Sequence, residues 1–170
     1  MANIYVTSFT GDLLAVQEKN GPLKGTGFWK IPTGLLDAKE DIHVASCREV
    51  LEETGIETEF VGLLCFRHAH NFMFGKSDLF FVCLLKPLTK TIVKQESEIE
   101  SCEWISLEKY MNQKLFLSSP VYSRLNLFIE QIAKEKEKKS YLQRFTLPLG
   151  NRPGYNTLYL PIEPPTILDS

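Results

Sequence analysis

One segment, residues 34–56, constrains the fold of this 170-residue chain more than any other. Its sequence is GLLDAKEDIHVASCREVLEETGI. The spacing of apolar and charged residues predicts a helix over residues 40–54, and Gly55 is expected to cap its C-terminus. One face of this helix is apolar, so we expect it to pack against a sheet. The apolar residues of that face are Val44, Cys47 and Leu51.

Three carboxylates share the opposite face of the predicted helix. Glu49, Glu52 and Glu53 stand at positions i, i+3 and i+4, where like charges cost a few tenths of a kcal/mol per close pair, about as much as an ion pair gains. A divalent cation removes this repulsion, because hard ions such as Mg²⁺ prefer carboxylate oxygens. Arg48 lies one turn before Glu52 and is placed to hold its carboxylate. The alternative is an ordinary solvated acidic face.

The spacing of the whole segment is more specific than the acidic face alone. It matches G-x5-E-x7-R-E-U-x-E-E-x-G-U, with U aliphatic, at every fixed position. This pattern is the Nudix box, and the chain therefore resembles the Nudix hydrolases. The resemblance implies an α/β fold, a Nudix-type α/β/α sandwich with a mixed central sheet. It also implies hydrolysis of nucleoside diphosphates linked to a second group X, with Mg²⁺ or Mn²⁺ as cofactor.

The resemblance assigns roles to residues of the box. It implies that Arg48 orients the acidic residues, that Glu40 supports the preceding loop, and that Gly55 is structural. Glu49 and Glu52 are candidates for polarising the attacking water. The implied metal ligands are Glu49, Glu52, Glu53 and Gly34, the last through its backbone carbonyl.

Four flanking segments extend the resemblance to roughly residues 11–135. Together they resemble one subgroup, the plant ADP-ribose/NADH pyrophosphatases and the animal protein encoded antisense to basic fibroblast growth factor. The segments are GFWKIPTG (27–34), FRHAH (66–70), KSDLFFVCLLKPL (76–88) and QESEIESCEWISLEKY (95–110). The subgroup implies ADP-ribose and/or NADH as substrate, release of AMP, and a homodimer. Its members carry a longer segment before the first strand than this chain does.

Other functions stay open at this point. A Nudix module that binds nucleotide or protein without catalysis is one alternative, although such a module has no need of all three acids. A Nudix enzyme acting on coenzyme A, a capped RNA end or an oxidised nucleotide is the other. The box indicates metal chemistry and does not select X.

Several residues outside the box are candidates for further roles. A general base is expected on a later loop, and Glu98 is preferred over Glu96 and Glu100, which otherwise belong to a solvated loop. For substrate binding, Arg67 and Lys76 are candidate phosphate ligands or surface charges. Trp29 either stacks on a base or ribose or packs in the core.

The composition favours a soluble protein that binds a small nucleotide. With 19 Lys and Arg against 21 Asp and Glu, the net charge of −2 disfavours nucleic acid as a partner. No apolar run reaches the ~20 residues that span a membrane, and no signal peptide is recognised, so a cytoplasmic location is expected. The four cysteines lack metal-ligand spacing and are predicted to be free thiols.

The remaining elements are expected around a central sheet. Residues 1–140 are predicted to form the Nudix domain and residues 141–170 a Pro-rich C-terminal extension, which is extended and includes a short strand at 158–160. Strands at 4–9 and 13–17 are predicted to pair as a hairpin. Further strands are expected at 58–66, 77–85 and 100–105, and helices at 107–111 and 121–139.

Overall fold

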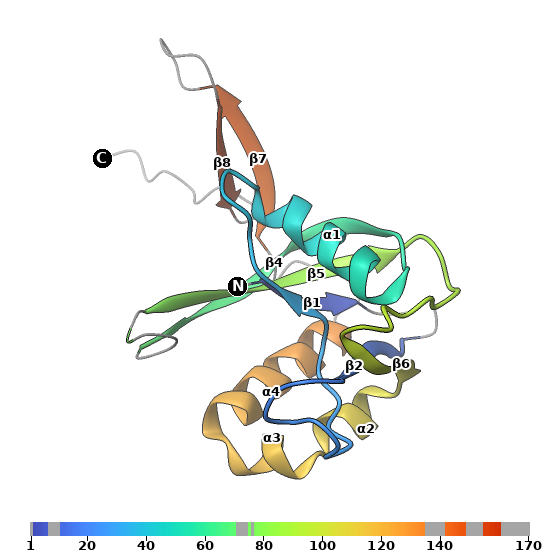
Figure 1. Ribbon diagram of the computed structural model, residues 1–170. Coiled ribbons are helices and arrows are strands. Elements are labelled where there is room, and N and C mark those ends of the chain that lie inside the picture. The colour runs from blue at the N-terminus through green and yellow to red at the C-terminus, as the bar shows by residue number, and fades with distance from the viewer. Residues whose placement is uncertain are drawn as a thin grey trace.

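The computed structural model describes residues 2–6, 11–70, 75, 77–134, 142–148 and 155–160 (Figure 1). The strands are β1 (Ala2–Val6), β2 (Leu13–Glu18), β3 (Thr33–Gly34), β4 (Thr58–Ala69), β5 (Asp78–Pro87), β6 (Ile99–Ile105), β7 (Gln143–Pro148) and β8 (Tyr155–Leu160). The helices are α1 (Ile42–Thr54), α2 (Leu107–Met111), α3 (Lys114–Ser118) and α4 (Pro120–Lys134). The predicted helix over 121–139 is therefore confirmed as far as Lys134, and its last five residues lie outside the described residues.

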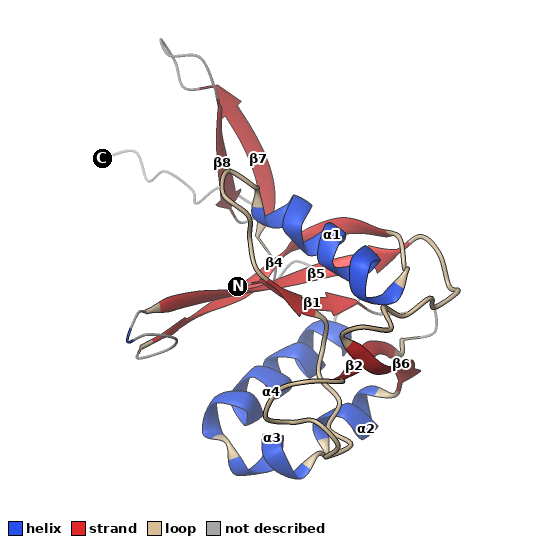
Figure 2. Cartoon of the chain, in the orientation of Figure 1, coloured by secondary structure: helices blue, strands red, loops and turns tan. Residues whose placement is uncertain are grey.

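A mixed four-stranded sheet forms the centre of the fold, in the order β3-β1-β5-β4 (Figure 2). β1 runs parallel to β5 and antiparallel to β3, and β4 is antiparallel to β5. β2 pairs instead with β6, in a separate antiparallel ribbon. The predicted hairpin between β1 and β2 is therefore wrong. The central position gives β1 a hydrogen-bonding neighbour on both edges, which a two-stranded hairpin does not provide.

Helices cover both faces of this sheet (Figure 1). Because side chains alternate along a strand, neighbouring residues of β5 face opposite layers. Leu84 belongs to the apolar cluster that contains Ile129 of α4, whereas Leu85 belongs to the cluster that contains Val50 of α1. This arrangement confirms the predicted α/β/α layers with a mixed central sheet.

The face that α1 turns to the sheet differs from the predicted one. Val44 and Leu51 are 48% and 49% exposed, so their predicted packing against the sheet is wrong. The buried residues of α1 are Ala45, Ser46, Val50, Glu53 and Thr54. Small side chains let the helix lie close to the strands on this face, and the rotation buries one of the three glutamates of the acidic face. This burial decides the electrostatics of the site described below.

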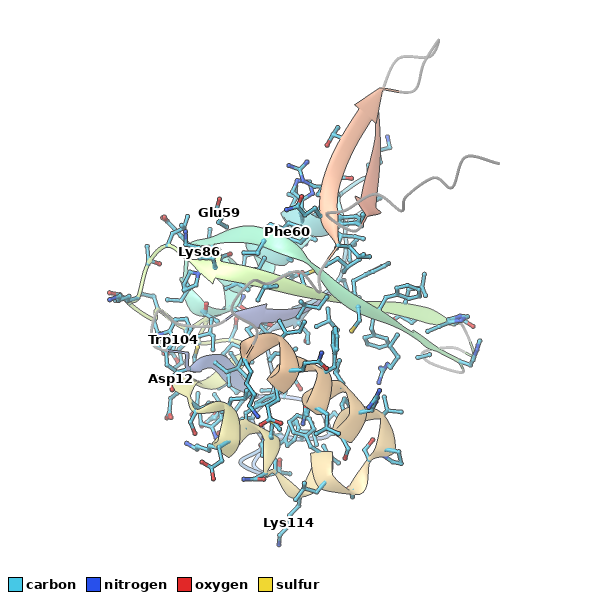
Figure 3. The ribbon with its side chains drawn as sticks, turned by 180° about the vertical axis from the view of Figure 1, so that it is seen from behind. Asp12, Glu59, Phe60, Lys86, Trp104 and Lys114 are labelled. Atoms are coloured by element: carbon cyan, nitrogen blue, oxygen red, sulfur yellow. The ribbon has the colours of Figure 1, made fainter. Side chains whose placement is uncertain are left out.

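The C-terminal hairpin β7–β8 lies against the edge of the central sheet. Leu142 and Leu63 exchange backbone hydrogen bonds of 2.9 and 3.0 Å, which join the start of the hairpin to β4. Phe60 of β4 lies beneath the hairpin, with its ring centroid 6.1 Å from Tyr159 and 5.9 Å from His43 of α1 (Figure 3). The strand predicted at 158–160 is thus longer than expected and has a partner.

Two further predictions concern the cysteines and the apolar segments of the chain. All four cysteines are free thiols, as predicted. In the part of the chain that the structure describes, no helix is both long enough and apolar enough to cross a membrane.

Candidate active site

A guanidinium–carboxylate pair fastens the loop before α1 to the helix itself. Arg48 Nε and Nη2 each donate a 2.8 Å hydrogen bond to a different oxygen of Glu40, and Nη2 also reaches the Leu35 carbonyl at 3.1 Å. The Asp37 amide donates to the same Glu40 carboxylate at 3.0 Å. These bonds lower the pKa of Glu40 to about 2, chiefly through the side-chain bond from Arg48. The loop 35–41 is therefore held by charge-assisted hydrogen bonds.

The remaining nitrogen of Arg48 reaches the acidic face of α1. Arg48 Nη1 donates to Glu49 Oε1 at 3.0 Å and to Glu52 Oε2 at 3.1 Å. Glu49 is mostly buried and Glu52 is half exposed, so the two carboxylates differ in their contact with solvent. One guanidinium thus joins the loop, through Glu40, to two of the three acids predicted to bind metal.

Gly34 lets the backbone of β3 approach the Glu49 side chain. A Cβ atom built on Gly34 would lie 1.8 Å from Glu49 Cδ, a distance that no side chain tolerates without displacing the carboxylate. Glu49 also loses solvent here, and burial raises its pKa although Arg48 opposes this. The absence of a side chain at residue 34 therefore sets the position of the Glu49 carboxylate against the sheet edge.

Glu53 is the most buried acid of the helix, with only 7% of its surface exposed. Its Oε2 atom has no hydrogen-bond partner among the described residues. Burial raises the pKa of Glu53 to about 8, the charge of Lys30 acts against this rise, and Glu49, Glu18 and Glu98 add to it. An ionised Glu53 in this position therefore requires additional positive charge.

Lys30 supplies part of that charge from the segment before β3. Its Nζ forms an ion pair with Glu18 at the end of β2 and donates a 2.8 Å hydrogen bond to Thr33 Oγ1. Glu18 was not predicted as a site residue, because a single glutamate at the end of a strand carries no local pattern. The bridge between Val16 of β2 and Lys30 brings the end of β2 beside Lys30 and so places Glu18 there.

The donor set fits a divalent cation. Three carboxylates of α1 supply oxygen donors of the type that such ions prefer, and one of their oxygens, on buried Glu53, has no partner among the described residues. Gly34 leaves room for the Glu49 carboxylate beside the sheet edge. Across the residues that the structure describes, however, no three His, Cys, Asp or Glu side chains are already gathered to hold a metal. Arg48 holds Glu49 and Glu52, so these carboxylates must turn toward Glu53 to share an ion.

The loop carrying Glu98 packs against the C-terminus of α1. The amides of Val93 and Gln95 donate to the last carbonyls of the helix, Thr54 and Glu53, at 2.8 and 3.0 Å. These bonds satisfy backbone acceptors that a helix end leaves unpaired. The loop thereby brings Glu98, which is exposed, into the electrostatic surroundings of Glu53.

Gly55 makes this packing sterically feasible. It has the positive φ predicted for a helix cap, 70°, and its amide donates to the Leu51 carbonyl. A Cβ atom at Gly55 would lie 2.8 Å from Val93 Cβ and 3.0 Å from the Val93 carbonyl oxygen. The residue therefore serves both the helix end and the close approach of the loop.

We expect Gly55→Ala to destabilise the protein by about 2 kcal/mol or more, because it adds a clash with the Val93 backbone to the ~1 kcal/mol cost of alanine at positive φ. Gly25→Ala is the matched control, since Gly25 has the same φ of 70° and nothing within 4 Å of its Cβ position. Urea unfolding of both variants measures the difference. Equal losses in the two variants would contradict the packing role of Gly55.

A pocket of about 800 Å³ begins beside this acidic site. Glu18, Lys30 and Thr33 line one part of it, and Arg67 of β4 lines another. α2, α3 and α4 close it with a largely aromatic wall formed by Tyr110, Phe116, Tyr122 and Phe128. Its size and mostly apolar lining are those of a small-molecule site.

The other predicted substrate residues differ in position. Trp29 does not line the pocket but lies in the apolar core with 9% of its surface exposed, and its amide and carbonyl both bond the side chain of Gln113. Lys76 lies outside the described residues. Asn126 of α4, a buried polar residue that lines the pocket, was not predicted, because one asparagine within an amphipathic helix gives no signal in the sequence.

Comparison with known proteins identifies the family. The NUDIX domain model matches residues 1–125, and the chain belongs to the Nudix family. It is 54% identical over 109 residues to Nudix hydrolase 2 of Arabidopsis thaliana, which covers 64% of this chain and 39% of that protein. It is 45% identical over 115 residues to nucleoside diphosphate-linked moiety X motif 6 of Xenopus laevis, covering 65% and 52% of the two chains. The predicted resemblance to plant and animal Nudix proteins is confirmed.

A solved structure supports the same fold. The NUDIX hydrolase from Nitrosomonas europaea superimposes with a TM-score of 0.61 over 76% of this chain and 86% of that chain, at 23% sequence identity. The chain spans less than half the length of the Arabidopsis protein and about half that of the Xenopus protein. Family membership is thereby established from residues 1–125, and the fold from the 76% of the chain that superimposes.

Proposed function

We propose that this chain hydrolyses the pyrophosphate bond of a nucleoside diphosphate linked to X, most favourably ADP-ribose or NADH, and releases AMP. The observation that carries the proposal is the close approach of Glu49 of α1 to Gly34 at the edge of the sheet, on a helix that also carries Glu52 and the buried Glu53, beside a pocket of about 800 Å³. Glu49, Glu52, Glu53 and the Gly34 carbonyl are the groups that would hold Mg²⁺ or Mn²⁺. When bound, the ion supplies charge neutralisation on the phosphoryl oxygens and activates water.

The chain's own residues have distinct tasks in this reaction. Arg48 and Glu40 keep the acidic face and the preceding loop in one arrangement, so little reorganisation is needed when substrate binds. Glu98 is the proposed base that takes the proton of the attacking water, with Glu49 or Glu52 as alternatives. The water oxygen bonds to one phosphorus, the P–O bond of the bridging oxygen breaks, and the departing phosphate takes that oxygen.

One feature supports ADP-ribose or NADH in particular, and a second supports a nucleoside in general. The segments flanking the box resemble plant ADP-ribose/NADH pyrophosphatases. The pocket is large and lined mostly by apolar and aromatic side chains, which suits a nucleoside better than a small inorganic group. Hydrolysis of coenzyme A, hydrolysis of capped RNA, and nucleotide binding without hydrolysis are the three alternative results, and a panel of substrates distinguishes them.

The test is hydrolysis of ADP-ribose, NADH, NAD⁺, coenzyme A and capped RNA, with Mg²⁺, with Mn²⁺, and with a chelator, followed as AMP from the first three compounds and as the corresponding nucleotide product from the other two. We expect release from ADP-ribose or NADH that disappears with chelator and returns when either ion is added back. Glu53→Gln should lower the rate by about 10²-fold or more, the range for losing one electrostatic group at a reacting centre.

Glu59→Gln provides the matched control, because Glu59 is an exposed glutamate of β4 paired with Lys86 and lies outside the site (Figure 3). Its rate should equal that of the wild type. Hydrolysis of coenzyme A or capped RNA alone would replace the proposed substrate. No release from any compound, together with retained nucleotide binding, would replace the enzyme with a binding module.

A further inference from the structure

Arg67 lies in an environment that is unusual for a phosphate-binding arginine. Its guanidinium carbon lies 4.2 Å from the ring centroid of Phe80 and 5.9 Å from that of Tyr122. Its Nε atom is buried and has no hydrogen-bond partner among the described residues. The two rings interact with the charge of the guanidinium and do not use its N–H groups as hydrogen-bond donors to oxygen or nitrogen, and Arg67 lines the pocket, where a ligand can accept from it.

The burial of Nε without a partner indicates that a ligand completes this site. A buried donor left unpaired is costly, and a pocket ligand that offers an acceptor removes that cost. The surroundings of Arg67 within the pocket are aromatic and apolar, which favours a flat ring with acceptor atoms on its edge over a strongly hydrated phosphate.

Asn126 extends the same end of the pocket. It stands one helical turn after Tyr122 on α4, so the two side chains share a helix face. Asn126 is 5% exposed and lines the pocket. Arg67 supplies donors only, whereas the Asn126 amide supplies both donors and an acceptor. Both residues therefore offer polar groups to a ligand in a pocket whose lining is mostly apolar.

Strand register places this pair at a defined distance from the acidic site. Thr33 of β3 and Cys65 of β4 lie in one row across the sheet, through Asn3 and Val82. Three strand spacings separate them, about 14 Å in total. Arg67 lies two residues beyond Cys65 on the same face. An extended nucleoside diphosphate bridges such a separation, with its phosphates at the Gly34 edge and its base at Arg67.

We infer that Arg67 and Asn126 recognise the base of the nucleotide, and that this base is a purine. An arginine fork pairs with O6 and N7 of guanine, and an asparagine amide pairs with N6 and N7 of adenine. Both pairings use the N7 edge, which pyrimidines lack. Arg67 is thus a specificity-determining residue for the base, in place of the phosphate role expected from its charge. This inference rests on the proposed nucleotide substrate.

The experiment measures equilibrium binding of AMP, GMP, CMP, UMP and ribose 5-phosphate to the whole chain in Mg²⁺. The wild type should bind at least one purine monophosphate about tenfold or more tighter than either pyrimidine and than ribose 5-phosphate. Arg67→Gln and Asn126→Leu should remove that advantage and leave ribose 5-phosphate binding unchanged. Arg67→Lys should fail to restore it, because lysine keeps the charge without the planar fork.

Arg144→Gln is the matched control, since Arg144 is an exposed arginine of β7 outside the pocket. It should bind all five compounds as the wild type does. Thermal melts of each variant check folding, and Arg67→Lys and Asn126→Leu test the inference if Arg67→Gln does not fold. Equal loss of AMP and ribose 5-phosphate binding in Arg67→Gln, or full rescue by Arg67→Lys, would assign Arg67 to phosphate and overturn the inference.

The outcomes separate this inference from the proposed activity, because monophosphates are not hydrolysed. Purine binding that depends on Arg67, in a protein that releases no AMP, keeps the inference and removes the proposed hydrolysis. AMP release by a protein that binds all four nucleotides and ribose 5-phosphate equally keeps the hydrolysis and removes the inference.

Discussion

Gly34→Ala is expected to lower AMP release by about 10²-fold or more while leaving the chain folded. The added methyl group would lie 1.8 Å from Glu49 Cδ and 2.2 Å from Glu49 Cγ, so the carboxylate must leave its position at the sheet edge. A misplacement of about 1 Å at a reacting centre already costs about 10²-fold in rate. Gly34 does not have a positive φ, so alanine introduces no left-handed backbone strain here. The measurement is kcat at saturating divalent ion, with circular dichroism as the check of folding.

A double-mutant cycle assigns the loss to Glu49. If Gly34→Ala acts by displacing this carboxylate, the variant Gly34→Ala/Glu49→Gln should be about as slow as Glu49→Gln alone, because the second change removes what the first displaces. Losses that multiply in the double variant would show that Gly34 acts independently of Glu49. A Gly34→Ala protein with the wild-type rate would contradict the close approach seen at this strand.

The box residues were predictable from sequence because their spacing is local. Glu49, Glu52 and Glu53 share a helix face at any helix orientation, and Arg48 reaches Glu52 across one turn. The rotation of α1 about its axis is a tertiary property. This rotation buries Glu53 and exposes Val44 and Leu51. Periodicity within the helix could not indicate it, since the face that carries Val44 and Leu51 was an equally acceptable packing surface.

Residues brought together by distant strands were not predictable in the same way. Glu18 meets Lys30 because β2 and the segment before β3 run side by side, joined by the bridge between Val16 and Lys30. Only the fold shows that Arg67 contacts aromatic rings, because Phe80 comes from β5 and Tyr122 from α4. For Trp29 the sequence left two interpretations, and the structure places it in the core.

Glu40→Gln is expected to destabilise the protein by about 2–3 kcal/mol at neutral pH. The substitution removes the carboxylate that accepts two hydrogen bonds from Arg48 and one from the Asp37 amide, and it leaves the Arg48 charge without its fork partner. Glu40 is mostly buried, so solvent screens this pair less than a surface ion pair. Urea unfolding of both proteins gives the difference in free energy.

The same pair makes a signed prediction about pH. In the folded protein the pKa of Glu40 falls from its ordinary 4.5 to about 2, so between these values the unfolded chain binds more protons than the folded one. The stability that Glu40 contributes is therefore complete well above pH 4.5 and is lost as the pH falls through 4.5 toward 2. The gap in unfolding free energy between wild type and Glu40→Gln should be constant from about pH 7 to about pH 5.5 and should narrow below that. Other carboxylates titrate in both proteins and largely cancel in this difference. A gap that stays constant down to about pH 3, or widens in acid, would show that the Arg48 pair is not the source of the stabilisation.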